Sequence, residues 1–158
     1  MKRIINIILG AAVIMSAAAS CKKDDAVVLL DKALVGEWHL TETNVEGTVL
    51  DEDLADVYVI FAADGTFELY QKTGSSMRYY KYSGTCTTEG NKTLRGTYSD
   101  GTPWGSVYTY SAGASLLSLT TKDGMETQTY EKDSMDQEDK DNAYVVTKAT
   151  PTENKPIL

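Results

Sequence analysis

The sequence has very few of the residue types that build metal and nucleophilic sites. Its 158 residues include one His and two Cys, whereas a structural zinc site needs about four Cys or His ligands. The lone histidine, His39, would also have to serve any Ser-His-Asp site, and no Gly-x-Ser-x-Gly turn accompanies it. We therefore expect no metal, no cofactor and no catalytic residue of these kinds, with His39 at the surface or rim.

Positively charged residues are scarce as well. Lys and Arg total 15 against 23 Asp and Glu, a formal net charge of −8, and residues 1–20 hold two of the cations and no acid. Without those residues the chain would carry 13 cations against 23 acids, or −10. Phosphate contacts need clustered Lys and Arg, so this balance excludes a nucleic-acid partner.

One long hydrophobic run is present, and it lies at the N-terminus. Lys2 and Arg3 precede an apolar stretch over residues 4–19, which is shorter than the roughly 20 residues that usually span a bilayer. Small residues at 17–20 end the run. A basic start, an apolar centre and a small-residue exit are typical of a secretory signal peptide, which we predict over residues 1–20.

The residue that follows this segment is Cys21. Residues 18–21, with the sequence AASC, resemble a lipobox, at which bacterial signal peptidase II cuts before a diacylglyceryl-modified Cys. The resemblance implies that Cys21 is lipidated, that residues 21–33 are a lipidated tether, and that the acyl chains insert in a membrane. The simpler alternative is an ordinary cleaved signal peptide that is followed by an unmodified Cys.

The charged residues after Cys21 bear on location. Residues 22–25, with the sequence KKDD, resemble the export signal of Bacteroidota-type lipoproteins, a Lys followed by two acids just beyond the lipidated Cys. This resemblance implies an outer-membrane lipoprotein exposed at the cell surface. The alternative is a simple charged tether on a protein that stays on the periplasmic face.

The body of the chain predicts an all-β fold. Asp-Gly pairs at 64–65, 100–101 and 123–124 suit two-residue hairpin turns, which require positive φ. No long amphipathic helix separates the apolar-polar alternations between the turns, so we expect an antiparallel up-and-down meander, closed as a barrel or packed as a sandwich. The eight expected strands span residues 36–44, 56–62, 66–72, 77–88, 93–99, 104–111, 115–121 and 125–132.

Two short motifs carry a family resemblance. Residues 34–38 (LVGEW) resemble the Gly-x-Trp opening strand of lipocalins and fatty-acid-binding proteins, and residues 61–67 (FAADGTF) resemble a hairpin of bacterial lipocalin-like lipoproteins. The chain is thus similar to lipocalin-like domain lipoproteins of the Bacteroidota type. The resemblance implies an eight-stranded barrel over residues 34–132, with Trp38 closing one end. A plain core role for Trp38 is the alternative.

The C-terminal part, residues 133–158, is expected to be an acidic connector and a polar tail. Residues 133–142 are too rich in Asp to be packed, residues 143–148 suit a short extra strand, and residues 150–158 suggest a loose tail. The acidic run lacks the spacing of a calcium loop. Asp133-Ser134-Met135 resembles a three-residue O-glycosylation acceptor of the same bacterial group, which makes Ser134 a candidate modification site.

Aromatic side chains gather in three consecutive expected strands. Phenol and indole groups are apolar in body and polar at the tip, so they suit a ligand cavity, and they equally suit cross-strand packing that fills a barrel. Both interpretations stay open from sequence alone. The candidate ligand-binding residues are Tyr80, Tyr82, Tyr98, Trp104, Tyr108 and Tyr110.

Two further groups receive a plain interpretation. Paired carboxylates could hydrolyse glycosides without histidine, but an acidic sheet surface carries outward Glu in any case. Cys86 is the only thiol left if Cys21 is lipidated, so it has no partner for a disulfide within the chain. We expect Cys86 to be a small buried residue and the protein not to be an enzyme.

The sequence as a whole favours a lipid-anchored, lipocalin-like barrel that binds a small apolar or amphipathic ligand, an inference that rests on fold analogy. The alternative is a filled barrel that serves as a non-catalytic subunit of a surface complex or as an inhibitor of a cationic enzyme. A mature charge of −10 would steer such a partner. No motif identifies the partner or the ligand.

The N-terminal interpretation yields a first prediction. Changing Cys21 to Ala should abolish metabolic labelling with acyl chains and release the protein from the membrane fraction, because no other residue of the tether is expected to carry lipid. Cys86→Ala serves as the control and should leave labelling unchanged. A Cys21→Ala protein that stays labelled and membrane-bound would contradict the lipobox interpretation.

Overall fold

The computed structural model describes residues 30–45, 54–90, 92–149 and 156–158. Residues 1–29, which include Cys21 and the segment expected to be a signal peptide, lie outside this description, so the signal peptide and the lipidation remain predictions. Among the described residues, none of the helices has both the length and the apolar character needed to cross a membrane.

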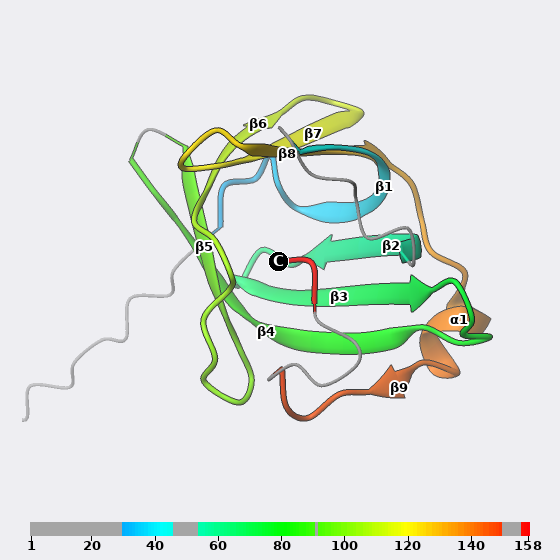
Figure 1. The fold of residues 1–158 in the computed structure, drawn as a ribbon. Coiled ribbons are helices and arrows are strands. Elements are labelled where there is room, and N and C mark those ends of the chain that lie inside the picture. The colour runs from blue at the N-terminus through cyan, green and yellow to red at the C-terminus, as the bar shows by residue number, and fades with distance from the viewer. Residues whose placement is uncertain (1–29, 46–53, 91, 150–155) are drawn as a thin grey trace, which may run out of the picture.

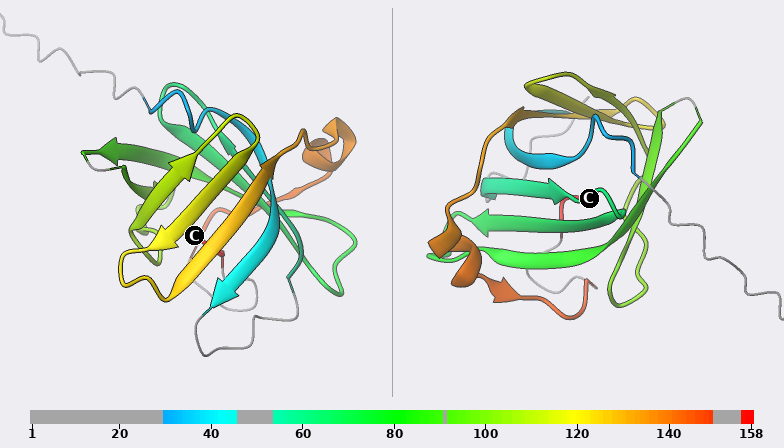
Figure 2. Two further views of the ribbon diagram at one scale, coloured as in Figure 1. Left: turned by 90° about the horizontal axis from the view of Figure 1, so that it is seen from above. Right: turned by 180° about the vertical axis from the view of Figure 1, so that it is seen from behind.

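Eight antiparallel strands close into a barrel, and a ninth short strand lies beside it (Figures 1 and 2). The elements are β1 (Gly36–Val45), β2 (Leu54–Phe61), β3 (Thr66–Thr73), β4 (Tyr80–Glu89), β5 (Thr93–Tyr98), β6 (Tyr108–Ala112), β7 (Leu116–Thr121), β8 (Glu126–Lys132), α1 (Gln137–Asp141) and β9 (Tyr144–Val145). The sheet order is β3-β2-β1-β8-β7-β6-β5-β4, and pairing of β3 with β4 closes the ring. The all-β, up-and-down barrel predicted from the sequence is confirmed.

Alternate residues of the strands face the interior, as the apolar-polar alternation predicts. The inward positions are at most 1% exposed: Val57, Val59 and Phe61 in β2, Phe67 and Leu69 in β3, Leu117 and Leu119 in β7. Between β2 and β3 the chain turns at Gly65, whose φ of 83° is the positive value that the Asp-Gly pair predicts. Burial of each such side chain stabilises the fold by about 1.5–3 kcal/mol.

Two strands begin three or four residues later than the sequence predicts. β4 begins at Tyr80 rather than at residue 77, and β6 begins at Tyr108 rather than at residue 104. Trp104 lies outside β6 because its backbone N–H donates to the Gly96 carbonyl (3.0 Å). Its indole covers the same glycine, so closely that an added Cβ at Gly96 would lie 2.2 Å from the ring.

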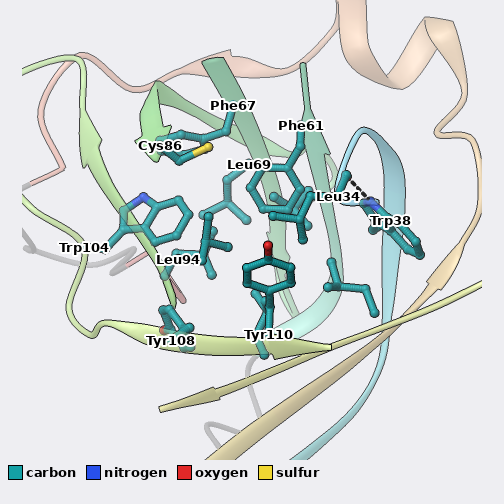
Figure 3. Close-up of a cluster of buried hydrophobic side chains, with 14 of the residues drawn as sticks. Leu34, Trp38, Phe61, Phe67, Leu69, Cys86, Leu94, Trp104, Tyr108 and Tyr110 are labelled. Carbon is teal, nitrogen blue, oxygen red and sulfur yellow. Dashed lines mark hydrogen bonds between the residues drawn. The ribbon is translucent and has the colours of Figure 1, made fainter. Parts of the chain in front are cut away.

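The segment just before β1 covers one end of the barrel. Leu30 and Leu34 are buried there, and the Leu30 N–H donates to the Ala63 carbonyl (3.3 Å). Trp38 is completely buried beneath them and donates its indole N–H to the Leu34 carbonyl (2.8 Å), the bond drawn dashed in Figure 3. We call this the covered end; β3 ends and β8 begins at the opposite end.

The connector after β8 is more packed than its composition predicts. Asp136 caps α1 with its side chain, Lys140 forms an ion pair with Glu37 of β1 (2.7 Å), and Met135 is only 5% exposed. Most of residues 133–142 are exposed and α1 buries none of its residues, as the polar composition predicts, whereas Met135 departs from the expectation and is packed. One apolar side chain and one ion pair suffice to hold this segment against the outer surface of the barrel.

The end of the chain also differs from the sequence expectation. The extra strand expected within residues 143–148 is present as β9, which pairs parallel with β4. The loose tail expected over residues 150–158 is wrong for its last three residues: Pro156 and Leu158 are buried, and Ile157 is half-buried. Figure 1 shows the C-terminus inside the ring of strands, because apolar side chains gain by leaving water there.

The close contact between Gly96 and Trp104 yields a second prediction. Gly96→Ala should lower the free energy of unfolding by about 1–3 kcal/mol, because the new methyl group overlaps the indole and forces it to move. Gly90→Ala is the matched control, since nothing lies within 4 Å of its added Cβ. Urea denaturation checks both; equal midpoints for the two variants would contradict this placement of Trp104.

Candidate functional site

The candidate site is the interior of the barrel between Trp38 and the end opposite the covered end. Five of the six aromatic residues expected to bind ligand are buried in one hydrophobic cluster there: Tyr82, Tyr98, Trp104, Tyr108 and Tyr110. Figure 3 shows three of them, Trp104, Tyr108 and Tyr110, around Leu94. The sixth, Tyr80, is half-buried and packs against Tyr144 of β9, with ring centroids 5.8 Å apart.

The aromatic rings of the site pack edge to face. The Trp104 ring centroid lies 5.0 Å from that of Phe67 and 6.1 Å from that of Tyr108. The Tyr98 ring lies 5.7 Å from Phe67 and 6.0 Å from Tyr82. Such pairs prefer this geometry and stabilise one another by about 0.5–1.5 kcal/mol each. The rings therefore form a continuous wall over β3, β4, β5 and the segment before β6.

Two buried glutamines complete the site, and sequence reasoning missed both. Gln71 of β3 is 1% exposed and Gln128 of β8 is completely buried. Each occupies an inward position of its strand, two residues after Leu69 and two before Tyr130. Polar side chains at the inward positions of an alternating strand were the available signal, because a buried amide must find hydrogen-bond partners.

The amide of Gln128 is oriented by its neighbours. Its Oε1 accepts from the Tyr130 hydroxyl (2.6 Å), and its Nε2 donates to the Glu126 carboxylate (2.7 Å). A second, longer bond runs from Nε2 to the Ile157 carbonyl (3.4 Å). Since the oxygen is engaged by Tyr130, the Nε2 protons are left to face Glu126 and the C-terminal segment.

The backbone of the last two residues lies among these polar groups. The Tyr98 hydroxyl donates to the Leu158 carbonyl (2.7 Å), and the Tyr108 hydroxyl donates to the Ile157 carbonyl over a longer distance (3.4 Å). The Ile157 N–H in turn donates to Oε1 of Gln71 (3.2 Å). Donors and acceptors from four strands or their ends thus converge on one short piece of chain.

One polar group of the site has no partner. The Trp104 indole N–H is buried and makes no hydrogen bond within the part of the chain that the structure describes. A buried donor without an acceptor costs about 1–3 kcal/mol. Native interiors rarely leave such a donor unpaired, so this N–H is the donor of the wall that a bound acceptor would satisfy.

The phenols of the site are kept neutral. Burial raises the pKa of Tyr82 to about 12. Burial, together with the nearby Asp31 carboxylate, which accepts from the hydroxyl (2.6 Å), raises the pKa of Tyr110 to about 12. Desolvation also raises the pKa values of Tyr98 and Tyr108 above the usual range. These hydroxyls therefore remain hydrogen-bond donors at any physiological pH.

The remaining thiol, Cys86, is free and only 2% exposed. Burial raises its pKa to about 12, so the reactive thiolate form is rare at neutral pH. Within the described ranges, no group of three or more His, Cys, Asp or Glu side chains could hold a metal ion.

The other residues singled out from the sequence lie outside the interior. His39 is stacked on Tyr58, with ring centroids 4.4 Å apart, and contacts Asp56 (2.7 Å). Tyr79 donates to the same carboxylate. Ser134 is exposed next to Asp133, and its glycosylation stays a prediction.

Comparison with known proteins places the chain among barrels of this type. Residues 34–119, more than half of the chain, match the lipocalin-like domain family. No curated protein matches the chain.

Solved structures give the following likenesses. A DUF4847 family protein from Bacteroides vulgatus is 14% identical, with a TM-score of 0.45, over 66% of this chain and 97% of that one. A protein from Bacteroides uniformis is 22% identical, with a TM-score of 0.47, over 68% and 96%. The REP1-NXSQ fatty acid transporter is 14% identical, with a TM-score of 0.39, over 65% and 98%.

The buried phenols yield a third prediction. The pKa values of Tyr82 and Tyr110 are raised from 10.0 to about 12 in the folded protein, so both contribute stability that is present below pH 10 and is lost as the pH rises through 12. Ultraviolet absorbance during alkaline titration should show these phenols ionising late, and Tyr82→Phe should remove one late step. Ionisation of every tyrosine near pH 10 in protein that is still folded would place these phenols in water.

Proposed function

This chain belongs to the lipocalin-like domain family, and we propose that its barrel holds a small apolar or amphipathic ligand in the interior beside Tyr98, Trp104 and Tyr108. The observation that carries the proposal is the buried Trp104 indole N–H, which has no acceptor among the described residues and belongs to a ring that packs against Phe67 and Tyr108. Lipocalin-like barrels are generally binding proteins rather than catalysts, which supports a non-catalytic role.

The chemistry of the wall defines the class of ligand. Rings and aliphatic side chains supply apolar contact, while the hydroxyls of Tyr98 and Tyr108 and the indole of Trp104 are neutral donors. A wall of this chemistry would select a ligand with a flat or apolar body and one or more acceptor atoms, such as a carbonyl, carboxylate or sulfonate. A bare alkyl chain would leave the Trp104 donor unpaired.

The expected location follows from the N-terminus. The predicted lipidation of Cys21 and the Lys-Lys-Asp-Asp sequence of residues 22–25 support an outer-membrane lipoprotein at the cell surface, with the barrel carried on the tether. A surface barrel with an internal site would retain its ligand near the membrane. The periplasmic face is the alternative location.

A filled barrel that acts as an interaction subunit is the second candidate. It is favoured by the mutual packing of the rings, since Trp104 contacts both Phe67 and Tyr108, and eight strands leave an interior that side chains alone can fill. In that case the interior is only a core, and the partner would contact the outer surface.

A fourth prediction separates these functions. Trp104→Phe keeps an aromatic ring and removes the indole N–H, so it should weaken binding of the flat, acceptor-bearing probe 1-anilinonaphthalene-8-sulfonate about 10-fold, the loss expected for one hydrogen bond to a charged group. Tyr58→Phe, on the outer surface, is the matched control and should not change the affinity. Fluorescence titration of the soluble protein, without its lipid, measures both.

Native mass spectrometry of the same protein provides the second readout. A small molecule retained from expression supports the ligand-binding function. Lack of any retained molecule together with failure of the probe to bind would favour the filled scaffold.

A further inference from the structure

The last three residues of the chain occupy the interior as a ligand would. Leu158 is 2% exposed and belongs to the same hydrophobic cluster as Trp104 and Tyr108, and Pro156 is buried beside it. Earlier in the chain, Thr147 and Lys148 are exposed and Ala149 is buried. Both views in Figure 2 show the C-terminus between the strands rather than outside them.

The barrel holds this segment by its backbone. The Ile157 carbonyl accepts from Tyr108 and Gln128, and its N–H donates to Gln71. The Leu158 carbonyl accepts from Tyr98. These partners are side chains of the barrel wall. The segment is therefore bound by side-chain hydrogen bonds and does not pair with a strand of the sheet.

The apolar wall carries side-chain donors and one acceptor at positions that match a peptide group. Such an arrangement is a binding site for an extended apolar peptide. A peptide backbone loses its bonds to water when it enters an apolar interior and must regain them there. Here three donors and one acceptor of the wall meet two carbonyls and one N–H of residues 157–158.

We propose that the segment Pro156–Leu158 is a built-in peptide occupant of the ligand site, and that an apolar ligand bearing acceptor atoms binds by displacing it. The inference rests on the proposed function. It adds that a segment of the chain itself occupies the site and competes there with the ligand. The interior thereby takes two occupants in turn: an extended apolar peptide from its own chain, and a ligand.

Attachment to the chain explains how so short a segment remains bound. The Ala149 N–H donates to the Asp100 carboxylate (2.7 Å), which fastens the chain to the turn after β5. Only residues 150–155 separate this anchor from Pro156. Because the segment belongs to the same chain as this anchor, its binding is intramolecular and has a high effective concentration, so a weak contact is enough for occupancy.

The unpaired donor explains how a ligand competes with the segment. Tyr98 and Tyr108 are engaged by the segment, whereas the indole N–H of Trp104, whose ring packs against that of Tyr108, has no partner among the described residues. The Leu158 main-chain oxygen lies near Gly105, the residue that follows Trp104: an added Cβ at Gly105 would be 4.0 Å from this oxygen. A ligand that brings an acceptor to Trp104 as well gains a bond that the segment does not make.

The test compares variants of the full chain. Leu158→Glu places a charge in the apolar interior and should expel the segment, so 1-anilinonaphthalene-8-sulfonate should bind about 10-fold more tightly than to the unchanged chain, since the competing occupant no longer reduces the fraction of free sites. Thr147→Glu adds the same charge at an exposed position outside the site and is the matched control. This control should not change the affinity.

Two further measurements do not depend on the Leu158→Glu variant folding normally. In the unchanged protein, hydrogen exchange at the Ile157 amide should be slow and should accelerate when the probe is added, because displacement exposes that N–H. A synthetic peptide with the sequence of residues 152–158 should compete with the probe on the Leu158→Glu protein.

The outcomes distinguish this proposal from the proposed function. Equal probe affinity in all variants, with Trp104→Phe still weakening it and Ile157 exchange unchanged, would overturn the built-in occupant and leave the ligand site standing. Binding of the peptide but not of the probe to Leu158→Glu protein would support the peptide site and overturn displacement by a ligand. Binding of neither would overturn both.

Discussion

Closure of the sheet is the constraint from which the rest of this structure follows. Pairing of β3 with β4 joins the two ends of the strand order, so all inward side chains share one interior and the ring has no open edge. Beside this junction, the close approach of β4 to β5 requires Gly84, where an added Cβ would lie 2.1 Å from the Thr97 carbonyl oxygen. Once the ring is closed, every inward polar group must find its partner inside it.

That requirement makes the polar groups of the interior informative. Tyr130, Gln128 and Glu126 satisfy one another through short hydrogen bonds, and Tyr110 bonds to Asp31 beneath the covered end. The partners of Tyr98 and Tyr108 come instead from the end of the chain. Near the covered end the interior thus uses Asp31 as a partner, whereas near the end where β8 begins its polar groups bond both to one another and to a separate segment of the chain.

The two proposals share this dependence. A wall that recognises a peptide group through neutral phenols and amides can accept other molecules with acceptors of the same kind, because hydrogen-bond geometry rather than net charge selects the occupant. Proximity favours the chain's own segment, and the unpaired Trp104 donor favours a ligand. The relative affinities of the segment and the ligand decide whether the barrel is filled by its own chain or binds a ligand. Both interpretations of the aromatic residues, filled core and ligand site, then apply to the same interior.

The sequence by itself determined the barrel. Asp64-Gly65 and the alternation in β2 and β3 are local signals, since turn chemistry and period-2 burial act between near neighbours. Tertiary structure decided what the interior contains. Gln71 and Gln128 both bond to Ile157, which requires β3 and β8 to face the same interior. Local sequence predicts a loose tail for residues 156–158 because their partners lie as many as 86 positions away in the chain. Contacts across such separations depend on closure of the ring, and no local pattern encodes them.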